Sequence, residues 1–483
     1  MMSPLFTVRY RQLESTRSLL MPSMQRGLST VRAKSQLVTR LGGVRSPPAL
    51  PMMKAQSRPA RLNEIARNPQ RFATTDALSV LAKMKTSVQS NPMSWWVFGT
   101  AGLVATTLTV GSAARLTRSG ASMLYWKPGG IMSPTSERDW EREFEIYHDF
   151  CCYHQRKPMT FGEFIQNYKW ENAHRLLGQT TALAFLGPLG YFFAKKAIPV
   201  WMQAPLVLTT GLGALQMFVG RLMVRQNLVG DGAKHHKPDD FVSTFGLPVH
   251  EAMSLGIFST LVWTGLNLMS PTTRAVKMRE LTMTSALKDI GKVHQYMHWV
   301  TGLLMGTIVA GTLVAEIDAG RAFNTSPKMG DHWIPKGMFG QKPLLRNFYD
   351  NAGLVLFDHR VLAVGTLTAY TVINLKAHKA NVWKNLPGET KLAMNATMAA
   401  VAGQVGTLYL VFSKFIVGST FFVCTQVLVG ATMLANSMPT TLALVHQGGA
   451  VLILGSSIWA MHTLRFARPG GILGVAKLAT KML

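Results

Sequence analysis

The chain has 483 residues, of which 48% are hydrophobic and only 15% are charged, so its composition argues against a soluble protein, in which about a quarter of the residues are charged. The net charge of +27 would suit a nucleic-acid-binding protein, but the Lys and Arg residues gather at the amino terminus and in loops between apolar runs, where anionic lipid accounts for them. The three cysteines lack the spacing of a metal site or a disulfide framework, so neither is expected.

The first segment in chain order is basic and nearly free of acids. Residues 1–60 hold ten Lys or Arg and a single acid, Glu14, together with many Ser, Thr, Met and Pro. This composition is typical of a mitochondrial transit peptide, and a disordered basic tail is the simpler alternative. We therefore expect residues 1–90 to be a transit peptide and a disordered basic amino terminus.

Eight charge-poor runs follow, and most are close to the length that a helix needs to cross ~30 Å of hydrocarbon. The segment 392–435 could hold one long helix or two short ones, and a single crossing is the simplest interpretation. The sequence therefore predicts an all-α polytopic membrane protein with eight transmembrane helices. The runs are 95–114, 176–194, 200–220, 252–273, 296–315, 361–375, 415–435 and 440–464.

The basic residues in the loops orient these helices. The connections after the second, fourth and sixth runs and the tail after the eighth are basic, so they fall on one side with the amino terminus. In a mitochondrion this side is the matrix. The two long loops, 115–170 and 317–357, then share the opposite side. The orientation of the whole set, with the carboxyl-terminal tail on the matrix side, holds only if 392–435 crosses once.

A weak internal repeat divides the membrane region into two halves, residues 91–273 and 274–470, which a tail at 471–483 follows. Each half has a histidine near the start of its second and fourth helices and Gln-x-x-x-Gly in its third, "QMFVG" at 216–220 and "QVLVG" at 426–430. Because the repeats are parallel, they predict two pseudo-symmetric four-helix bundles related by an axis along the membrane normal. The four histidines are His174, His250, His359 and His446.

These histidines suggest a cofactor. A single histidine near a membrane surface is usually structural, because polar residues there find internal partners. Four histidines at matched positions, two in each half, favour axial ligation of heme iron, since imidazoles on facing helices commonly hold heme in a bundle. Each half would then hold one heme, with its edge toward the non-matrix surface.

Charged residues accompany the first histidine of each half. Arg175 and Arg360 suit pairing with heme propionates, and interfacial snorkelling explains them equally well. Glu171 lies three residues before His174, so the two share a helix face. This acid could move protons, or it could be a helix-start acid stabilised by the helix dipole. The second half has Asp358 at a different offset instead, so the first half is the better candidate for catalysis.

At these residues the sequence resembles the mitochondrial form of the heme A synthase family, over roughly residues 95–470. The motifs "NTSPKMG", "FDHR" and "HQ" in this order are specific to it, unlike any single histidine. The matching stretches include "ARLTRSGASM" (114–123), "MTFGEFIQNYKWENAHRLLGQ" (159–179), "IDAGRAFNTSPKMGDHWIP" (317–335), "NAGLVLFDHRVLAV" (351–364) and "TTLALVHQGGAVLILG" (440–455).

The resemblance implies an activity, partners and a location. The activity is oxidation of a methyl group of heme O to the formyl group of heme A by successive hydroxylations, which supplies cytochrome c oxidase. A matrix ferredoxin would be the electron donor, and heme O synthase and oxidase assembly factors would be further partners. The location would be the mitochondrial inner membrane, and the oligomeric state, monomer or homo-oligomer, stays open.

The resemblance also assigns roles to residues. Glu171 would be the catalytic acid, and a heme b cofactor in the second half would relay electrons. The substrate heme would lie against His174, His250 and Arg175, and heme b against His359, His446 and Arg360.

The sequence departs from the family near the second histidine and before the seventh helix. Gly246 stands where the family usually has Arg, and Pro248 and Glu251 are unusual so close to His250. The stretch 392–414 has the character of an insertion.

Other functions compete with the synthase. A di-heme membrane electron carrier would need the four histidines but not Glu171, and a catalytically inactive relative would act as a heme chaperone or oxidase assembly factor. A transporter ranks last, because neither half has broken helices with paired Gly or Pro near the midplane.

Overall fold

The computed structural model describes residues 92–124, 133–153, 158–229, 241–269, 284–379, 382–402 and 425–467. Within these residues the regular elements are helices, apart from an isolated β-bridge between Met329 and His332. The expected all-α fold is therefore confirmed. The predicted transit peptide and the tail at 471–483 lie outside the described residues.

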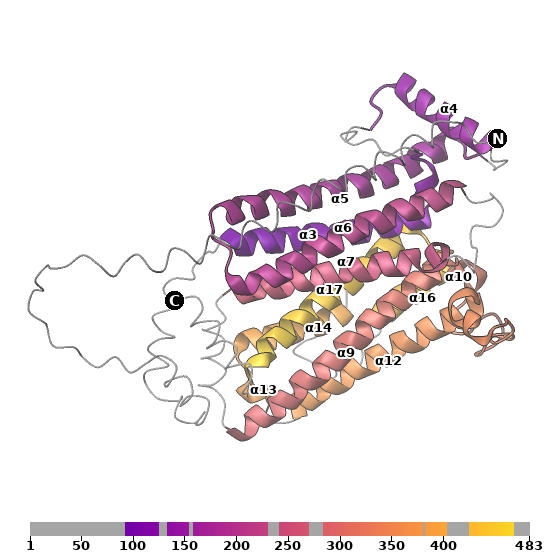
Figure 1. The fold of residues 1–483 in the computed structure, drawn as a ribbon. Helices are drawn as coiled ribbons and strands as arrows, with labels where there is room; N and C mark the ends of the chain where they lie inside the picture. Colours follow the sequence, from indigo (N-terminus) through magenta and orange to yellow (C-terminus); the bar gives the residue numbers. More distant parts are fainter. Residues whose placement is uncertain are drawn as a thin grey trace, which may run out of the picture. The chain divides into compact units, whose positions relative to one another are not determined.

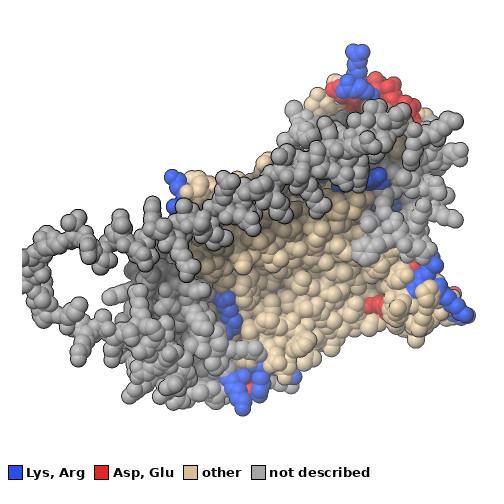
Figure 2. Space-filling model, viewed as in Figure 1, with Lys and Arg blue, Asp and Glu red and all other residues tan. Residues whose placement is uncertain are grey.

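Seven of the described helices are long and apolar enough to cross a membrane. In Figure 2 the charged residues of the described surface lie near the two ends of these helices, with an uncharged band between them. The chain is therefore an α-helical polytopic membrane protein. The seven are α3 (Pro92–Leu116), α5 (Phe161–Ala194), α6 (Val200–Val229), α7 (Phe241–Leu268), α9 (Thr284–Glu316), α12 (Ala352–Lys379) and α17 (Thr440–Leu464).

The described residues of the segment that was expected to hold one further crossing belong to two helices. α14 (Gly388–Ala402) and α16 (Thr425–Ala435) both pack along α17 and also contact each other. Residues 403–424, which include part of the predicted run 415–435, lie outside the described residues. An eighth crossing therefore stays a prediction.

Local sequence decides where the helices that carry the candidate site begin. α5 follows a capping box, in which the Thr160 side chain accepts from the backbone N–H of Glu163 and the Glu163 carboxylate accepts from the backbone N–H of Thr160. α12 begins after Asn351, whose Oδ1 accepts from the backbone N–H of Gly353 at 3.0 Å. These caps place the polar residues further along each helix.

Four helices form the centre of the described membrane region (Figure 1). α7 and α17 contact each other, and each of them also contacts both α3 and α9. Their apolar side chains form the main buried cluster, with Val97, Leu255, Leu304 and Leu454 among its members. α5 packs on α3 and α6 on α7, while α12 packs on α9 and both α14 and α16 on α17. A twofold relation would exchange these contacts in pairs, and the symmetry itself stays a prediction.

The two long loops meet at one end of the central helices. Arg115 at the end of α3 pairs with Glu316 at the end of α9, with Nε and Oε2 3.4 Å apart, and Arg118 pairs with Asp318. This is the arrangement that the loop charges predict, because both loops then begin on the same side. Short helices in these loops and in the loop after α12 are η3 (Ser119–Ala121), α4 (Glu137–Tyr153), α10 (Ala319–Ala322), η4 (Leu344–Arg346), α11 (Asn347–Asp350) and α13 (Val382–Asn385).

Candidate functional site

Each of the four predicted histidines lies against a glycine of a neighbouring helix. A Cβ atom built on these glycines would lie 2.9 to 3.3 Å from Cε1 of the facing imidazole. Carbon atoms pack at about 3.5–4.0 Å, so only glycine lets the ring approach this closely. The pairs are Gly111 with His174, Gly220 with His250, Gly311 with His359, and Gly430 with His446.

A polar residue stands one helical turn before each of these glycines. The backbone carbonyl of Thr307 accepts from Nδ1 of His359 at 3.1 Å, and Nε2 of Gln426 lies 3.1 Å from Nδ1 of His446. An imidazole whose Nδ1 donates, as that of His359 does to a carbonyl, presents Nε2 to a metal, which is the usual arrangement for a histidine ligand. The four polar residues are Thr107, Gln216, Thr307 and Gln426.

The corresponding contacts in the first half are looser. Nε2 of Gln216 lies 3.5 Å from Nε2 of His250 and also donates to the Ser254 hydroxyl. The buried Nδ1 atoms of His174 and His250 have no hydrogen bond of ordinary geometry to another described residue. The backbone of Thr107 lies near His174 and that of Gln216 near His250, so these two rings are held by weaker contacts than the rings of the second half.

The structure brings the histidines together in two pairs. His174 on α5 lies close enough to His250 on α7 to interact with it electrostatically, and His359 on α12 interacts in the same way with His446 on α17. Each pair therefore comes from two helices of the same half.

Glu171 forms a buried ion pair beside the first histidine. Arg175 Nε donates to Glu171 Oε1 at 2.7 Å, and the Ser119 hydroxyl donates to Oε2 at 3.2 Å. The carboxylate side chain is 8% exposed and the guanidinium side chain 13%. Because α5 begins at Phe161, Glu171 lies well inside the helix, and the explanation as a helix-start acid is wrong.

Arg360, at the equivalent position of the second half, has different partners from Arg175. It donates to the backbone carbonyl of Thr325 at 2.6 Å and to that of Pro327 at 3.1 Å, both in the second long loop. Both arginines thus bond a long loop, since Arg175 Nη2 donates to the Met123 carbonyl at 3.1 Å, but only Arg175 also holds a carboxylate. The two halves differ at this position, and pairing of either arginine with a propionate stays a prediction.

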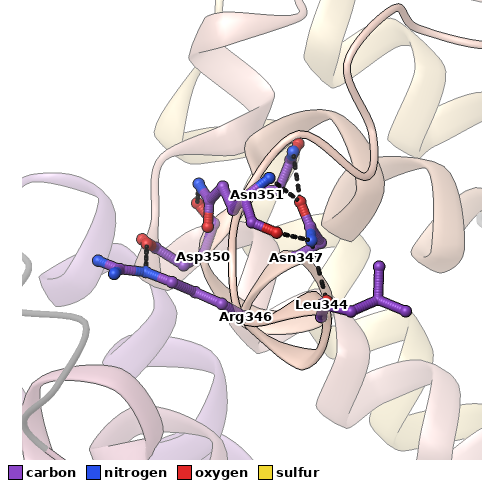
Figure 3. Close-up of polar contacts among 6 residues, drawn as sticks. Leu344, Arg346, Asn347, Asp350 and Asn351 are labelled. Atoms are coloured by element: carbon purple, nitrogen blue, oxygen red, sulfur yellow. Dashed lines mark hydrogen bonds and ion pairs between the residues drawn. The ribbon is translucent and has the colours of Figure 1, made fainter.

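A polar cluster holds the second long loop just before α12 (Figure 3). Asn347 is buried, and its Nδ2 donates to the Leu344 carbonyl at 2.9 Å, while Asn351 Nδ2 donates to Asn347 Oδ1 at 3.2 Å. Arg346 Nε pairs with Asp350 Oδ2 at 2.9 Å. Because Asn351 also caps α12, the cluster fixes the start of the helix that carries the third histidine.

The sequence analysis named the Gln-x-x-x-Gly pairs but missed Thr107, Gly111, Thr307 and Gly311 beside the other two histidines. Thr-x-x-x-Gly occurs at 107–111 and again at 307–311, just as Gln-x-x-x-Gly occurs at 216–220 and 426–430. A spacing of four places both residues on one helix face. This repeat in the first helix of each half therefore predicts a glycine that faces a histidine on the next helix.

The fold and the site together define a class of protein, an α-helical polytopic membrane protein with one buried histidine pair in each half. Residues 94–413 match a family model described as COX15-CtaA, cytochrome oxidase assembly protein. The chain belongs to this family.

Several relatives match the chain over most of its length. Heme A synthase COX15 of Bos taurus is 32% identical over 77% of this chain and 81% of its own length. Heme A synthase COX15 of Arabidopsis thaliana is 32% identical over 85% of this chain and 84% of its own. Heme A synthase of Nitrosospira multiformis is 32% identical over 82% of this chain and 99% of its own.

Proposed function

We propose that this protein is a heme A synthase, which oxidises a methyl group of heme O to the formyl group of heme A by successive hydroxylations. The observation that carries the proposal is the set of four glycine–histidine pairs, two in each half, with a buried Glu171 beside the histidine of the first half alone. The relatives that carry the name heme A synthase support it.

The residues of both halves fit a heme. Two imidazoles from facing helices are the ligand set that a porphyrin iron accepts at its two axial positions. The glycine opposite each ring supports this fit, because a Cβ there would displace the imidazole. Among the described residues, no group of three or more His, Cys, Asp or Glu could hold a metal ion by itself.

The second half would hold the cofactor, heme b, through His359 and His446. The Nδ1 atoms of these two rings lie 3.1 Å from Thr307 O and Gln426 Nε2, so both rings are oriented by the protein. A heme that is bound permanently suits such fixed ligands. Heme b bound there supplies single electrons to the reaction in the first half.

The first half would hold the substrate, heme O, through His174 and His250. Glu171 takes up and releases protons at the rim of the porphyrin, since it lies one helical turn before His174. Arg175 and Ser119 each bond one of its two carboxylate oxygens, so they hold the carboxylate in place. The looser contacts of the two histidines suit a ligand that must bind as substrate and leave as product.

The location follows from the loop charges and from the amino-terminal composition. We place the protein in the mitochondrial inner membrane, with its basic loops in the matrix. A matrix ferredoxin would deliver electrons to that side, and heme O synthase and oxidase assembly factors would act as further partners. Exposed lysines at the matrix ends of the helices would attract an acidic donor; they are Lys288, Lys292, Lys376 and Lys384.

Reconstitution tests the function directly. The purified protein is supplied with heme O, molecular oxygen, ferredoxin and its reductase, and the hemes are then extracted for mass spectrometry. Hydroxylated heme O and heme A are the expected products. Unchanged heme O in a protein that binds both hemes would favour the di-heme electron carrier. Failure to restore heme A in a cell that lacks its own synthase would favour the inactive assembly factor.

A further inference from the structure

Two side chains connect the helices that carry the second histidine of each half. Glu251 follows His250 directly on α7, and Gln447 follows His446 directly on α17. Gln447 Nε2 donates to Glu251 Oε1 at 2.6 Å, and Glu251 is only 8% exposed. The bond therefore joins the same position of the two halves, inside the membrane region.

Helix geometry explains why this bond can link the two sites. Successive residues of an α-helix point about 100° apart, so a helix that directs His250 toward the first site directs Glu251 toward a neighbour. For Glu251 that neighbour is α17, and for Gln447 it is α7. His250 is therefore connected to His446 through the backbone between residues 250 and 251, the Glu251–Gln447 hydrogen bond, and the backbone between residues 446 and 447.

A buried carboxyl group in a membrane is costly and is retained where it has a purpose. Apolar side chains would fill the contact between α7 and α17 without this cost, as they do elsewhere in the central cluster. A directional hydrogen bond differs from apolar packing because it fixes the rotation and the register of one helix against the other.

A second set of hydrogen bonds joins α7 and α17, far from His250 and His446. Asn267 of α7 lies 3.0 Å from His462 Nε2 and accepts from Arg465 at 2.7 Å, both near the end of α17. Asn267 is sixteen residues, or about 24 Å, along α7 from Glu251. Both sets of hydrogen bonds hold α7 against α17, but only the Glu251–Gln447 bond lies next to His250 and His446.

We propose that Glu251 and Gln447 are positioning residues, whose hydrogen bond sets the placement of His250 relative to His446. This inference rests on the proposed function, because the two histidines matter as ligands of two hemes that exchange electrons. Loss of the bond lets α7 and α17 shift against each other near the sites. Both imidazoles would then change position, and so would the hemes that they would hold.

The test reads the heme of the second half while either partner of the bond, Glu251 in the first half or Gln447 in the second, is changed. Glu251→Leu and Gln447→Leu are made in the full chain, purified with their native heme, and compared by electron paramagnetic resonance and by redox titration of the low-spin heme b. Both variants should shift the heme b signal and its midpoint potential, and the double variant should shift them no further. Glu251→Gln should keep the wild-type signal, because its amide oxygen still accepts from Gln447.

Asn267→Leu is the matched control. It removes the hydrogen bonds of Asn267 with His462 and Arg465, which join the same two helices far from His250. It should therefore lower the thermal stability while leaving the heme b signal unchanged. If Glu251→Leu does not fold, Gln447→Ala removes the donor without adding bulk and gives the same test.

Three results would overturn the inference. An unchanged heme b signal in both leucine variants would remove the positioning role, and an equal shift in Asn267→Leu would reduce it to general stability. A shift in Glu251→Gln as large as in Glu251→Leu would mean that charge, not the hydrogen bond, matters.

A wild-type protein without heme b would instead contradict the proposed function. In that case, thermal unfolding of the heme-free protein still decides whether positions 251 and 447 are coupled, and independent effects would overturn the bond itself.

Discussion

Glu171 is a buried carboxylate whose two oxygens are both bonded by side chains. Its partner Arg175 lies one turn further along the same helix, so the pair would form in any rotation of α5 within the bundle. Breaking a buried ion pair leaves an uncompensated charge, so removal of Arg175 would cost more than removal of an exposed arginine. The Glu171 carboxylate is therefore held in a fixed position near His174.

Glu171→Gln should lower the formation of heme A about 100-fold or more, because general acid–base catalysis typically contributes that factor. The heme content should stay unchanged, because no iron ligand is lost. Mass spectrometry of the extracted hemes measures both. Glu163→Gln on the same helix is the control, since Glu163 belongs to the exposed capping box. Full activity of Glu171→Gln would exclude the role of this acid.

Replacement of His359 or His446 by Ala should each remove one low-spin heme b from the purified protein, because an axial ligand is lost. Absorption and electron paramagnetic resonance spectra measure the loss. His298→Ala should leave the spectra unchanged, because His298 Nδ1 bonds the carbonyl of His294 within its own helix. A heme b signal that survives both first substitutions would refute the assignment of the second half.

At the scale of helices, the site depends on close approach between neighbours. α3 meets α5 and α9 meets α12 at glycines, and the imidazole occupies the space that a larger residue would fill. The histidine alone does not define the site, because its ring is oriented by the backbone of the adjacent helix.

Gly311→Ala should displace the His359 ring, since the new Cβ would lie 2.9 Å from Cε1. Such overpacking costs about 1–3 kcal/mol, and we expect a lower heme b content together with a lower unfolding temperature. Gly306→Ala on the same helix is the control, because no atom lies within 4 Å of the position that its Cβ would take, and heme b should be retained. Equal effects of the two substitutions would argue against the glycine as a determinant of the site.

At the scale of the whole membrane region, the halves are joined through their central helices and through ion pairs between the two long loops. Arg115 and Glu316 lie where α3 and α9 end, so the loops that follow begin on the same side. This arrangement agrees with the proposal that both histidine pairs lie toward one membrane surface and the basic loops toward the other.

Single cysteines should report this orientation. In a chain without its native cysteines, Ser136→Cys and Lys336→Cys should react with a membrane-impermeant maleimide from the intermembrane side of mitoplasts, because both positions are exposed in the long loops. Lys195→Cys, in the exposed connection after α5, should react only after the membrane is opened. Labelling of Ser136→Cys and Lys336→Cys from opposite sides would show that α5, α6, α7 and α9 do not each cross the membrane once, and it would contradict this orientation.

The sequence by itself determined the class of fold and most of the polar residues of the site. Hydrocarbon admits helices of about twenty apolar residues, so composition and run length already indicate the spans. A titratable side chain in such a run is costly, which is why the four histidines stand out. The proximity of Glu171 to His174 and Arg175 also follows from the sequence, because contacts three or four residues apart belong to a single helix.

Tertiary structure alone decided the contacts between helices. Gly311 lies 48 residues from His359, and Glu251 lies 196 residues from Gln447, yet each pair is in contact. The packing of both α14 and α16 on α17 likewise appears only in the tertiary structure. The physical reason is that a contact between two helices depends on the rotation and register of each against the other, which neither helix specifies alone.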